Sequence, residues 1–259
     1  MIGIFDSGLG GLTAVKEIKK LTGDELVYFG DTGRVPYGGR SSATITKYAE
    51  QDAAFLLDKN VDAIVVACGT VSTTALAHLK DITPVPVIGV VEPSAEAAVK
   101  ATKNGKIAVI GTAATIRSGA FTKAIKEIDD KIEVITQACP LFVPLVEAGF
   151  VSEDCEITRL TVEHYLKPIL ESGADTLILG CTHYPIIANT IANALPGVTL
   201  VSSGAEAAKK AVELLGAKPG DAKTSYFVSD DPKMFVSSAS LFLGEEISGS
   251  VTKIDIDKY

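Results

Sequence analysis

Two ten-residue stretches, VDAIVVACGT at residues 61–70 and ADTLILGCTH at residues 174–183, follow the same pattern. Each has an Asp at its second position, continues through aliphatic and β-branched residues, and ends in a Cys beside Gly or Thr. A short apolar run bounded by turn residues is typical of a buried strand in a parallel sheet. Because Cys68 and Cys181 occupy the same place in both stretches, the sequence predicts two similar halves, each with a thiol at the end of a strand.

Apolar runs alternate with amphipathic helical stretches along the rest of the chain, which predicts βαβ units and parallel sheets. The expected strands are 2–5, 26–30, 63–67, 87–90, 107–110, 132–136, 176–179 and 199–201. The expected helices are 12–21, 41–59, 73–79, 95–101, 117–128, 155–172, 186–194 and 205–215. The tail from Tyr226 onward is mixed, and Asp230-Asp231-Pro232 starts a turn or a helix.

The expected strands form two sets of four that align with each other. Residues 62–68 align with 175–181 at an offset of 113 residues, and residues 2–8 echo 107–113. A repeat this long indicates duplicated domains, because the unit of a solenoid is only about 20–50 residues long. We therefore expect an α/β protein of two similar, doubly wound parallel-sheet lobes. Residues 1–94 and 204–259 would form the lobe with Cys68, and residues 95–203 the lobe with Cys181, with a boundary near Pro93-Ser94.

The residues with reactive or polar side chains lie where expected strands end. In an open parallel sheet, the loops beyond these strand ends form the binding crevice. If the two crevices face each other, Cys68 and Cys181 oppose each other across a cleft between the lobes. Two opposed thiols suit removal and return of a proton on opposite faces of one carbon. That is the chemistry of a cofactor-free racemase or epimerase.

Composition argues against several other classes. The net charge is −8 and the sequence pI is about 5.0, without a run of Lys or Arg, so we expect no nucleic-acid partner. No apolar stretch approaches the roughly 18 residues of a membrane span, and no export signal opens the chain, which favours the cytoplasm. The four cysteines and three histidines show no metal-ligand spacing. No lysine has an obvious Schiff-base setting, so we expect no cofactor and no metal.

Each candidate residue also has a structural interpretation. A single Cys is more often a small buried hydrophobe than a reactive group, but recurrence in both halves favours chemistry for Cys68 and Cys181. Both precede an expected helix, whose N-terminus favours a thiolate. Cys139 and Cys155 lack this setting and are expected to pack or lie at the surface. Asp6 is as suited to capping a helix as to acting beside a thiol or a substrate ammonium group.

Two further segments point to the same crevice. His183, two residues after Cys181, can accept or return a proton at neutral pH, although a lone His is more often structural. The turn-rich segment 31–40 follows the second expected strand, and the backbone amides of Tyr37 and Gly38 could hold a carboxylate there. Most such segments are only loops.

Together these motifs resemble the glutamate racemase family within the aspartate/glutamate racemase superfamily, over most of the chain. The motifs are IFDSGLGGL at 4–12, YFGDT at 28–32 with PYG at 36–38, AC at 67–68, GT at 111–112 with Thr115, CPLFVPLVE at 139–147, and GCTHYP at 180–185. The resemblance implies cofactor-independent racemisation of glutamate and supply of D-glutamate to bacterial peptidoglycan, and hence to cell-wall biogenesis and cell shape. It also allows a homodimer.

The resemblance assigns roles to individual residues. It implies that Cys68 acts on the D-enantiomer with support from Asp6. Cys181 would act on the L-enantiomer with support from His183 and Glu147. The implied substrate-binding residues are Asp6, Ser7, Pro36, Tyr37, Gly38, Gly69, Thr70, Thr112, Thr115, Thr182 and His183.

One departure keeps the substrate open. The family usually has Asn after the first catalytic Cys, and this chain has Gly69. An aspartate or other acidic amino-acid racemase of the same superfamily is therefore an alternative, as is a non-catalytic two-lobed amino-acid-binding protein in which both thiols are dispensable. We expect Asn at position 69 to leave the fold undisturbed unless Gly69 has a positive φ.

Overall fold

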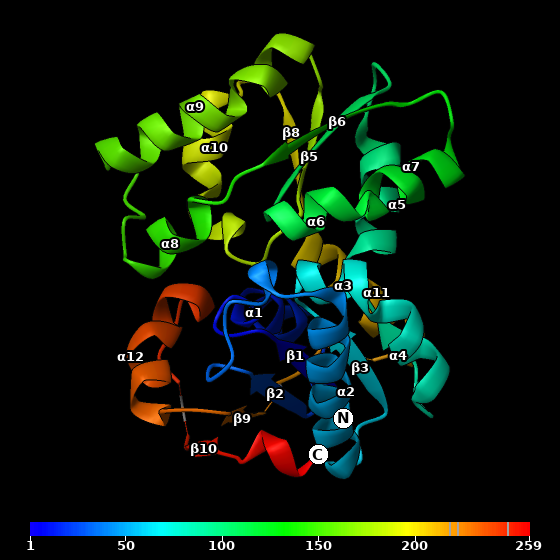
Figure 1. The fold of residues 1–259 in the computed structure, drawn as a ribbon, viewed down its shortest axis with the longest axis vertical. Helices are drawn as coiled ribbons and strands as arrows, with labels where there is room; N and C mark the ends of the chain where they lie inside the picture. Colours follow the sequence, from blue (N-terminus) through cyan, green and yellow to red (C-terminus); the bar gives the residue numbers. More distant parts are fainter. Residues whose placement is uncertain (218, 222, 248) are drawn as a thin grey trace.

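Two parallel sheets organise the computed structural model, which describes residues 1–217, 219–221, 223–247 and 249–259. The first sheet, in the lower lobe of Figure 1, has the strand order β10-β9-β2-β1-β3-β4. Its strands are β1 (Ile2–Asp6), β2 (Leu26–Gly30), β3 (Ala63–Val66), β4 (Val87–Ile88), β9 (Thr224–Val228) and β10 (Val251–Lys253). The second sheet has the order β6-β5-β7-β8, with β5 (Lys106–Gly111), β6 (Glu133–Ala138), β7 (Thr176–Leu179) and β8 (Thr199–Ser202).

The repeat seen in the sequence is a repeat of topology. The order β2-β1-β3-β4 in the first sheet matches β6-β5-β7-β8 in the second, strand for strand along the chain. Every pairing is parallel; Ile4 of β1, for example, lies between Tyr28 and Val65. The prediction of two similar α/β lobes with parallel sheets is confirmed, and all eight expected strands are present.

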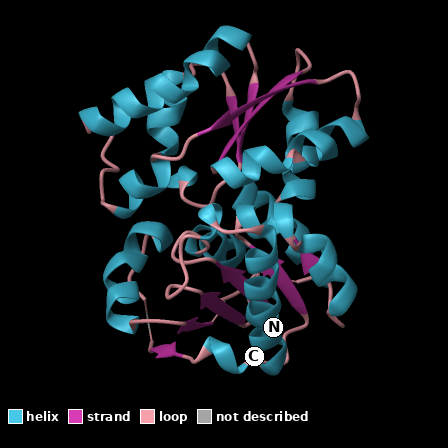
Figure 2. Ribbon diagram, viewed as in Figure 1, coloured by secondary structure: helices cyan, strands magenta, loops and turns pink. Residues whose placement is uncertain are grey.

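Helices connect the strands and cover the sheets, as Figure 2 shows for both lobes. They are α1 (Leu12–Leu21), α2 (Ser42–Asp58), α3 (Gly69–Thr74), α4 (Leu76–Ile82), α5 (Val91–Ala101), α6 (Ala113–Ser118), α7 (Ala120–Ile128), α8 (Phe142–Glu147), α9 (Glu156–Ser172), α10 (Ala188–Ala194), α11 (Ser203–Leu215) and α12 (Pro232–Leu243). Three 3₁₀ turns are η1 (Tyr37–Gly39), η2 (Tyr184–Ile187) and η3 (Ile256–Lys258). In the described part of the chain, none of the helices combines the length and apolar character that crossing a bilayer requires.

Several elements differ from the expectation. The single helix expected over 117–128 is two helices, α6 and α7, because Gly119 between them has a left-handed φ of 67° that ends α6. The helix expected over 73–79 is replaced by α3 and α4. The expectation did not include α8, β9 or β10, and it left α12 as a turn or a helix. The last three of these elements extend the first lobe, since β9 pairs with β2 and α12 packs on α1.

The two helices that follow the fourth strand of each lobe cross to the other lobe. Helix α5 follows β4 of the first sheet, yet packs against α7, β7 and β8 of the second lobe. Helix α11 follows β8 of the second sheet, yet packs against α1, β3 and β4 of the first. The two helices also contact each other. Positions 94 and 204, our expected lobe boundaries, lie within these helices, so that division of the chain stays a prediction.

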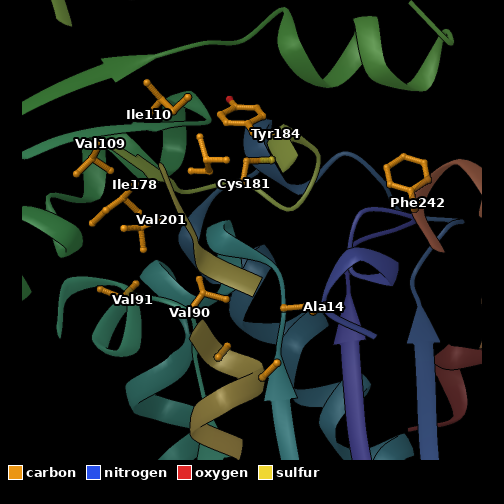
Figure 3. Packing of buried hydrophobic residues seen from close by; sticks show 14 of the residues in the cluster. Ala14, Val90, Val91, Val109, Ile110, Ile178, Cys181, Tyr184, Val201 and Phe242 are labelled. Carbon is orange, nitrogen blue, oxygen red and sulfur yellow. The ribbon is translucent and has the colours of Figure 1, made fainter. Parts of the chain in front are cut away.

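This exchange gives the lobes a common core. One cluster of buried apolar side chains contains residues of both sheets and of the crossing helices. Figure 3 shows part of it: Val91 of α5 lies below Val109, Ile178 and Val201 of the second sheet, and Ala14 of α1 lies further to the right. A second cluster lies on the other face of the first sheet, under α2. The cleft described next is therefore fixed by packing on both of its sides.

Candidate active site

The two repeated cysteines line one cavity between the lobes, with a volume of about 340 Å³. Cys68 lies after β3 and is the N-cap residue of α3, while Cys181 follows β7 and Gly180. Both side chains are buried, with 6% and 8% of their surface exposed. Because β3 and β7 are equivalent strands of the two sheets, the duplicated topology is what places one thiol on each side of the cavity.

Cys68 lies in a polar but buried environment. Its Sγ donates to Ser7 Oγ over 3.7 Å, and Asp6 lies behind Ser7 with only 1% of its surface exposed. Asp6 Oδ2 accepts from Gly8 N at 3.0 Å, whereas Oδ1 has no hydrogen-bond partner among the described residues. Burial raises the pKa of Asp6. Burial, and after it the Asp6 carboxyl, raises the pKa of Cys68 to about 12, so the thiol keeps its proton at neutral pH.

Cys181 instead has a cationic neighbour. His183 Nδ1 lies 3.9 Å from Cys181 Sγ, and His183 Nε2 lies 3.0 Å from Glu147 Oε1. Burial alone would lower the pKa of His183, but its contacts with Cys181 and Glu147 and the charge of nearby Asp6 raise it from 6.5 to about 10. The imidazole therefore holds both protons at neutral pH. The two thiols consequently have different surroundings, one beside a carboxyl group and one beside an imidazolium.

Threonine hydroxyls from both lobes form the polar part of the wall. Thr112 caps α6 by accepting from Thr115 N at 3.2 Å, and its Oγ1 lies 3.3 Å from Thr70 Oγ1 of the other lobe. Thr182, next to Cys181, also lines the cavity. No Lys or Arg of the described residues lines it, so an anionic ligand would have to be bound by hydroxyls, backbone N–H groups and His183.

The segment after β2 closes another side. Val35, Pro36, Tyr37, Gly38 and Gly39 line the cavity. The Tyr37 side chain is 1% exposed, and its hydroxyl points away from the cavity toward two buried carboxyl groups. The Tyr37 hydroxyl is thus bonded behind the cavity wall and not to a ligand in the cavity.

The structure brings together most of the residues expected from the sequence. The cavity is lined by the expected Cys68, Cys181, His183, Glu147, Ser7, Pro36, Tyr37, Gly38, Gly69, Thr70, Thr112 and Thr182. Two expected residues lie behind the wall. Asp6 is buried next to Ser7, and Thr115 is buried behind Thr112, whose Oγ1 donates to it over 3.0 Å. Direct contact of Asp6 and Thr115 with a ligand stays a prediction.

The apolar wall of the cavity was not predicted from the sequence. The additional lining residues are Val35, Gly39, Ala113, Cys139, Pro140, Val143, Pro144 and Gly180. A signal was present, because Pro140, Val143, Pro144 and Glu147 follow the spacing of one helical face. That face belongs to α8 and the turn before it. Cys139 is fully buried and contributes to the same wall, while Cys155 is half-buried elsewhere.

The expectation that Asn at position 69 leaves the fold undisturbed is contradicted, although its condition on φ is met. Gly69 lies in α3 and does not have a positive φ. A Cβ at this position would nevertheless lie 2.4 Å from the backbone oxygen of Gly180, in the other lobe. Because that neighbour is backbone, it cannot move aside as a side-chain end could. A side chain at position 69 would therefore force the Gly180 backbone to shift, so we expect an Asn there to disturb the close approach of the lobes.

Among the residues that the structure describes, no group of three or more His, Cys, Asp or Glu side chains could hold a metal ion.

Comparison with known proteins gives a consistent result. The Asp/Glu/Hydantoin racemase family matches residues 19–211. The curated glutamate racemase of Geobacter metallireducens is 46% identical over 264 residues, covering 99% of this chain and 97% of that protein. The crystal structure of glutamate racemase from Francisella tularensis in complex with D-glutamate matches with a TM-score of 0.91 and 37% identity, over 100% of this chain and 98% of that one. The Thermus thermophilus glutamate racemase structure, in complex with beta-chloro-D-alanine, matches with a TM-score of 0.88 and 41% identity, over 100% and 98% of the two chains.

Proposed function

The chain belongs to the Asp/Glu/Hydantoin racemase family, and from this premise we propose that it interconverts L- and D-glutamate through Cys68 and Cys181. One observation carries the proposal. Two thiols, at equivalent strand ends of two similar lobes, line the same cavity between the lobes. Racemisation needs a proton acceptor and a proton donor on opposite faces of the same carbon, which this arrangement supplies. No cofactor is part of the scheme.

In the L-to-D direction, Cys181 as thiolate takes the Cα proton of L-glutamate, and the electron pair of the broken C–H bond spreads into the α-carboxylate. Cys68 then gives its proton to the opposite face of Cα, which yields D-glutamate. The resting protonation suits this direction, since Cys68 keeps its proton and Cys181 has the His183 imidazolium in contact. The D-to-L direction uses the same steps in reverse, from the form that the L-to-D reaction leaves, in which Cys68 is the thiolate and Cys181 carries the proton.

The remaining residues bind the substrate and stabilise the carbanionic intermediate. Glutamate carries two carboxylates, and the cavity offers the hydroxyls of Ser7, Thr70, Thr112 and Thr182 together with the backbone N–H groups of Tyr37 and Gly38. Preorganised donors in a cavity with little water stabilise developing negative charge more than water does. Asp6 and the Glu147–His183 pair act through the thiols beside them. The apolar wall limits the access of water to Cα, so that the new proton on Cα comes from a thiol and not directly from solvent.

We further propose that the product, D-glutamate, supplies peptidoglycan synthesis in the bacterial cytoplasm. The relatives that carry the name glutamate racemase support the reaction. The acidic character of the chain, with a net charge of −8, supports the absence of a nucleic-acid partner. A homodimer is part of the proposal and is tested by sedimentation of the purified protein.

The route of the proton tests the two-thiol scheme. L-glutamate incubated in deuterated water with the protein, and with no added cofactor, should give D-glutamate that carries deuterium at Cα from the first turnover. Unreacted L-glutamate should stay protiated early in the reaction, because the proton acceptor for one face is not the donor for the other. Chiral chromatography with mass detection follows both species. Early D-product that is substantially protiated would indicate a single base and contradict the scheme.

Variants assign the thiols and separate the alternatives. Alanine at Cys68 or Cys181 should abolish racemisation, while Cys155→Ala, which changes a thiol away from the cavity, should leave it intact. A non-catalytic amino-acid-binding protein would bind glutamate without turnover and would be indifferent to the loss of either thiol. Running aspartate beside glutamate in the same assay decides between the two acidic substrates.

A further inference from the structure

A buried cluster of charged side chains lies directly behind the segment that closes the cavity. Asp31 follows β2, Arg34 and Tyr37 lie in the cavity-lining segment or next to it, and Asp52 lies on α2. Both aspartates are fully buried, and the Arg34 side chain is 14% exposed. None of the three charged side chains lines the cavity, so the cluster acts on the site only through Tyr37 and the backbone next to it.

The charged side chains of the cluster are joined to one another by hydrogen bonds. Arg34 Nε donates to Asp31 Oδ2 at 2.6 Å, and Arg34 Nη2 donates to Asp52 Oδ1 at 3.0 Å. Ser229 Oγ donates to the other oxygen of Asp31 at 2.7 Å, which ties the cluster to the loop after β9. The Tyr37 hydroxyl is in hydrogen-bond contact with Asp31 Oδ2 and lies 3.1 Å from Asp52 Oδ2.

The number of available protons decides which group is the donor in each of these hydrogen bonds. A phenol has one proton, so Tyr37 cannot donate to both carboxylates. If it donates to Asp31, the contact with Asp52 is a hydrogen bond only when Asp52 Oδ2 carries a proton and donates to Tyr37. Charge leads to the same assignment. Two carboxylates and one guanidinium would leave a net negative charge in a buried site, whereas one protonated carboxyl leaves the cluster neutral.

We propose that Asp52 is a positioning residue whose carboxyl group is protonated and donates a hydrogen bond to the Tyr37 hydroxyl. Tyr37 then donates its own hydrogen bond to Asp31, and these bonds fix the segment Pro36–Gly38 at the cavity. Burial and the neighbouring Asp31 carboxylate raise the pKa of Asp52 well above its usual value, in agreement with this assignment. With Ser229 bonded to Asp31 and Gln51 Oε1 accepting from Arg34 Nη1, each carboxyl oxygen of the cluster and the Tyr37 hydroxyl has a hydrogen-bond partner. Substrate-binding backbone amides are held in place by a group that the substrate does not touch.

Asparagine distinguishes the two aspartates. In Asp52→Asn, the amide N–H can donate to Tyr37 while its oxygen accepts from Arg34 Nη2, so the variant reproduces the protonated acid. In Asp31→Asn, both oxygens of the parent are acceptors, so an amide nitrogen must face a donor, and Arg34 loses its counterion. Asp52→Ala removes the donor altogether. Asp58→Asn, an exposed acid on the same helix, is the matched control.

Infrared spectroscopy detects the proton directly. The difference spectrum of the parent protein minus Asp52→Asn should contain the carbonyl stretching band of a protonated, buried carboxylic acid. The subtraction removes the contribution of other buried acids such as Asp6. The parent minus Asp58→Asn spectrum should lack the band. A parent minus Asp52→Asn spectrum without this band would overturn the proposal.

Steady-state kinetics measure how well the segment Pro36–Gly38 is positioned for substrate binding. The kinetic arm rests on the proposed glutamate racemisation. Asp52→Asn should keep kcat/KM within about threefold of the parent, because the hydrogen-bond pattern is preserved. Asp52→Ala and Asp31→Asn should lose about a hundredfold, chiefly through a raised KM, because the segment that binds substrate is displaced. Equal losses in Asp52→Asn and Asp52→Ala would overturn the assignment. A parent protein without racemase activity would refute the proposed function alone, since the infrared comparison does not depend on turnover.

Discussion

At the scale of single residues, glycines set the distance between the lobes. Besides Gly69, whose Cβ would meet the Gly180 carbonyl, a Cβ at Gly10 would lie 2.2 Å from Thr182 Oγ1 and 2.5 Å from His183 Nδ1. Both contacts join the first lobe to the strand end that carries Cys181. Because these positions have no side chain, the two thiol-bearing loops can come close enough to share one cavity.

The first prediction compares two glycines that line the same cavity. Gly69→Ala should lower the free energy of unfolding by about 1–3 kcal/mol, because its Cβ forces the lobes apart. Helix propensity alone would predict a gain of stability, since Gly69 lies in α3. Gly39→Ala should change stability by less than about 0.5 kcal/mol, because a Cβ there meets no atom within 4 Å.

Chemical denaturation measures both variants, and the racemase assay should show a lower kcat/KM for Gly69→Ala alone. Unchanged stability and activity in Gly69→Ala would show that the lobes can separate at this point without consequence.

The sequence was sufficient for the residues that carry chemistry and insufficient for those that shape the cavity. Cys68 and Cys181 stood out because they recur at equivalent strand ends. The need for Gly69 could not be seen, because the atom that excludes a Cβ belongs to Gly180, more than 100 residues away in the chain. The sequence likewise did not place Cys139, which follows β6, in the cavity wall.

At the scale of elements, the C-terminal helix α12 reaches the candidate active site from behind. Phe242 of α12 packs edge-to-face on the His183 ring, with 5.2 Å between the ring centroids, and it does not line the cavity. The same helix packs Phe235 on Tyr28 of β2. Helix α12 therefore fixes both the first sheet and the imidazole that contacts Cys181.

The second prediction tests this support. Phe242→Ala should destabilise the protein by about 3–5 kcal/mol and lower kcat/KM by about tenfold or more, because His183 loses the ring that fixes its orientation. Phe242→Leu should recover most of the stability and less of the activity. Met234→Ala, at a position of the same helix that is 71% exposed, serves as the control and should match the parent.

Assays are run below the unfolding temperature of the weakest variant. If Phe242→Ala turned over glutamate at the parent rate, α12 would have no part in positioning His183.

Elements were predictable where local pattern and tertiary structure agree. All eight expected strands, β1 to β8, were found from short runs of mostly aliphatic or β-branched residues. The strands β9 and β10 were missed because their sequences, TSYFV and VTK, mix polar with apolar residues. Strand β10 is also at the edge of the first sheet, where one side of a strand is unpaired. The division of 113–128 into α6 and α7 depends on the left-handed φ of Gly119, and a glycine within an otherwise helical pattern does not by itself reveal that conformation.

At the scale of the whole molecule, the crossing helices make the two lobes one folding unit. The cluster that includes both sheets runs through α5 and α11, so neither lobe can unfold without exposing apolar surface of the other. Internal similarity alone suggested two separable halves. Only the tertiary contacts of α5 and α11 reveal the exchange, because a helix with one apolar face does not specify which lobe it covers.

The third prediction concerns cooperativity. Thermal unfolding should be a single transition in which the calorimetric enthalpy equals the van't Hoff enthalpy, despite the two sheets. A charge placed in the shared cluster, as in Ala208→Asp on α11, should lower the unfolding temperature of the whole transition without splitting it. The exposed change Glu213→Gln on the same helix provides the comparison. Two resolved transitions would mean that the lobes unfold independently.

The exchange of α5 and α11 has a counterpart among assemblies of separate chains. When two identical protomers each give a terminal helix to the other, the result is a domain-swapped dimer with two-fold symmetry. Here each half of a single chain gives away the helix after its fourth strand and receives the equivalent one. The molecule thus has the architecture of a swapped dimer whose subunits are covalently joined. Its cavity lies between the halves, so Cys68 and Cys181 are counterparts that have been free to acquire different neighbours, a carboxyl group for one and an imidazole for the other.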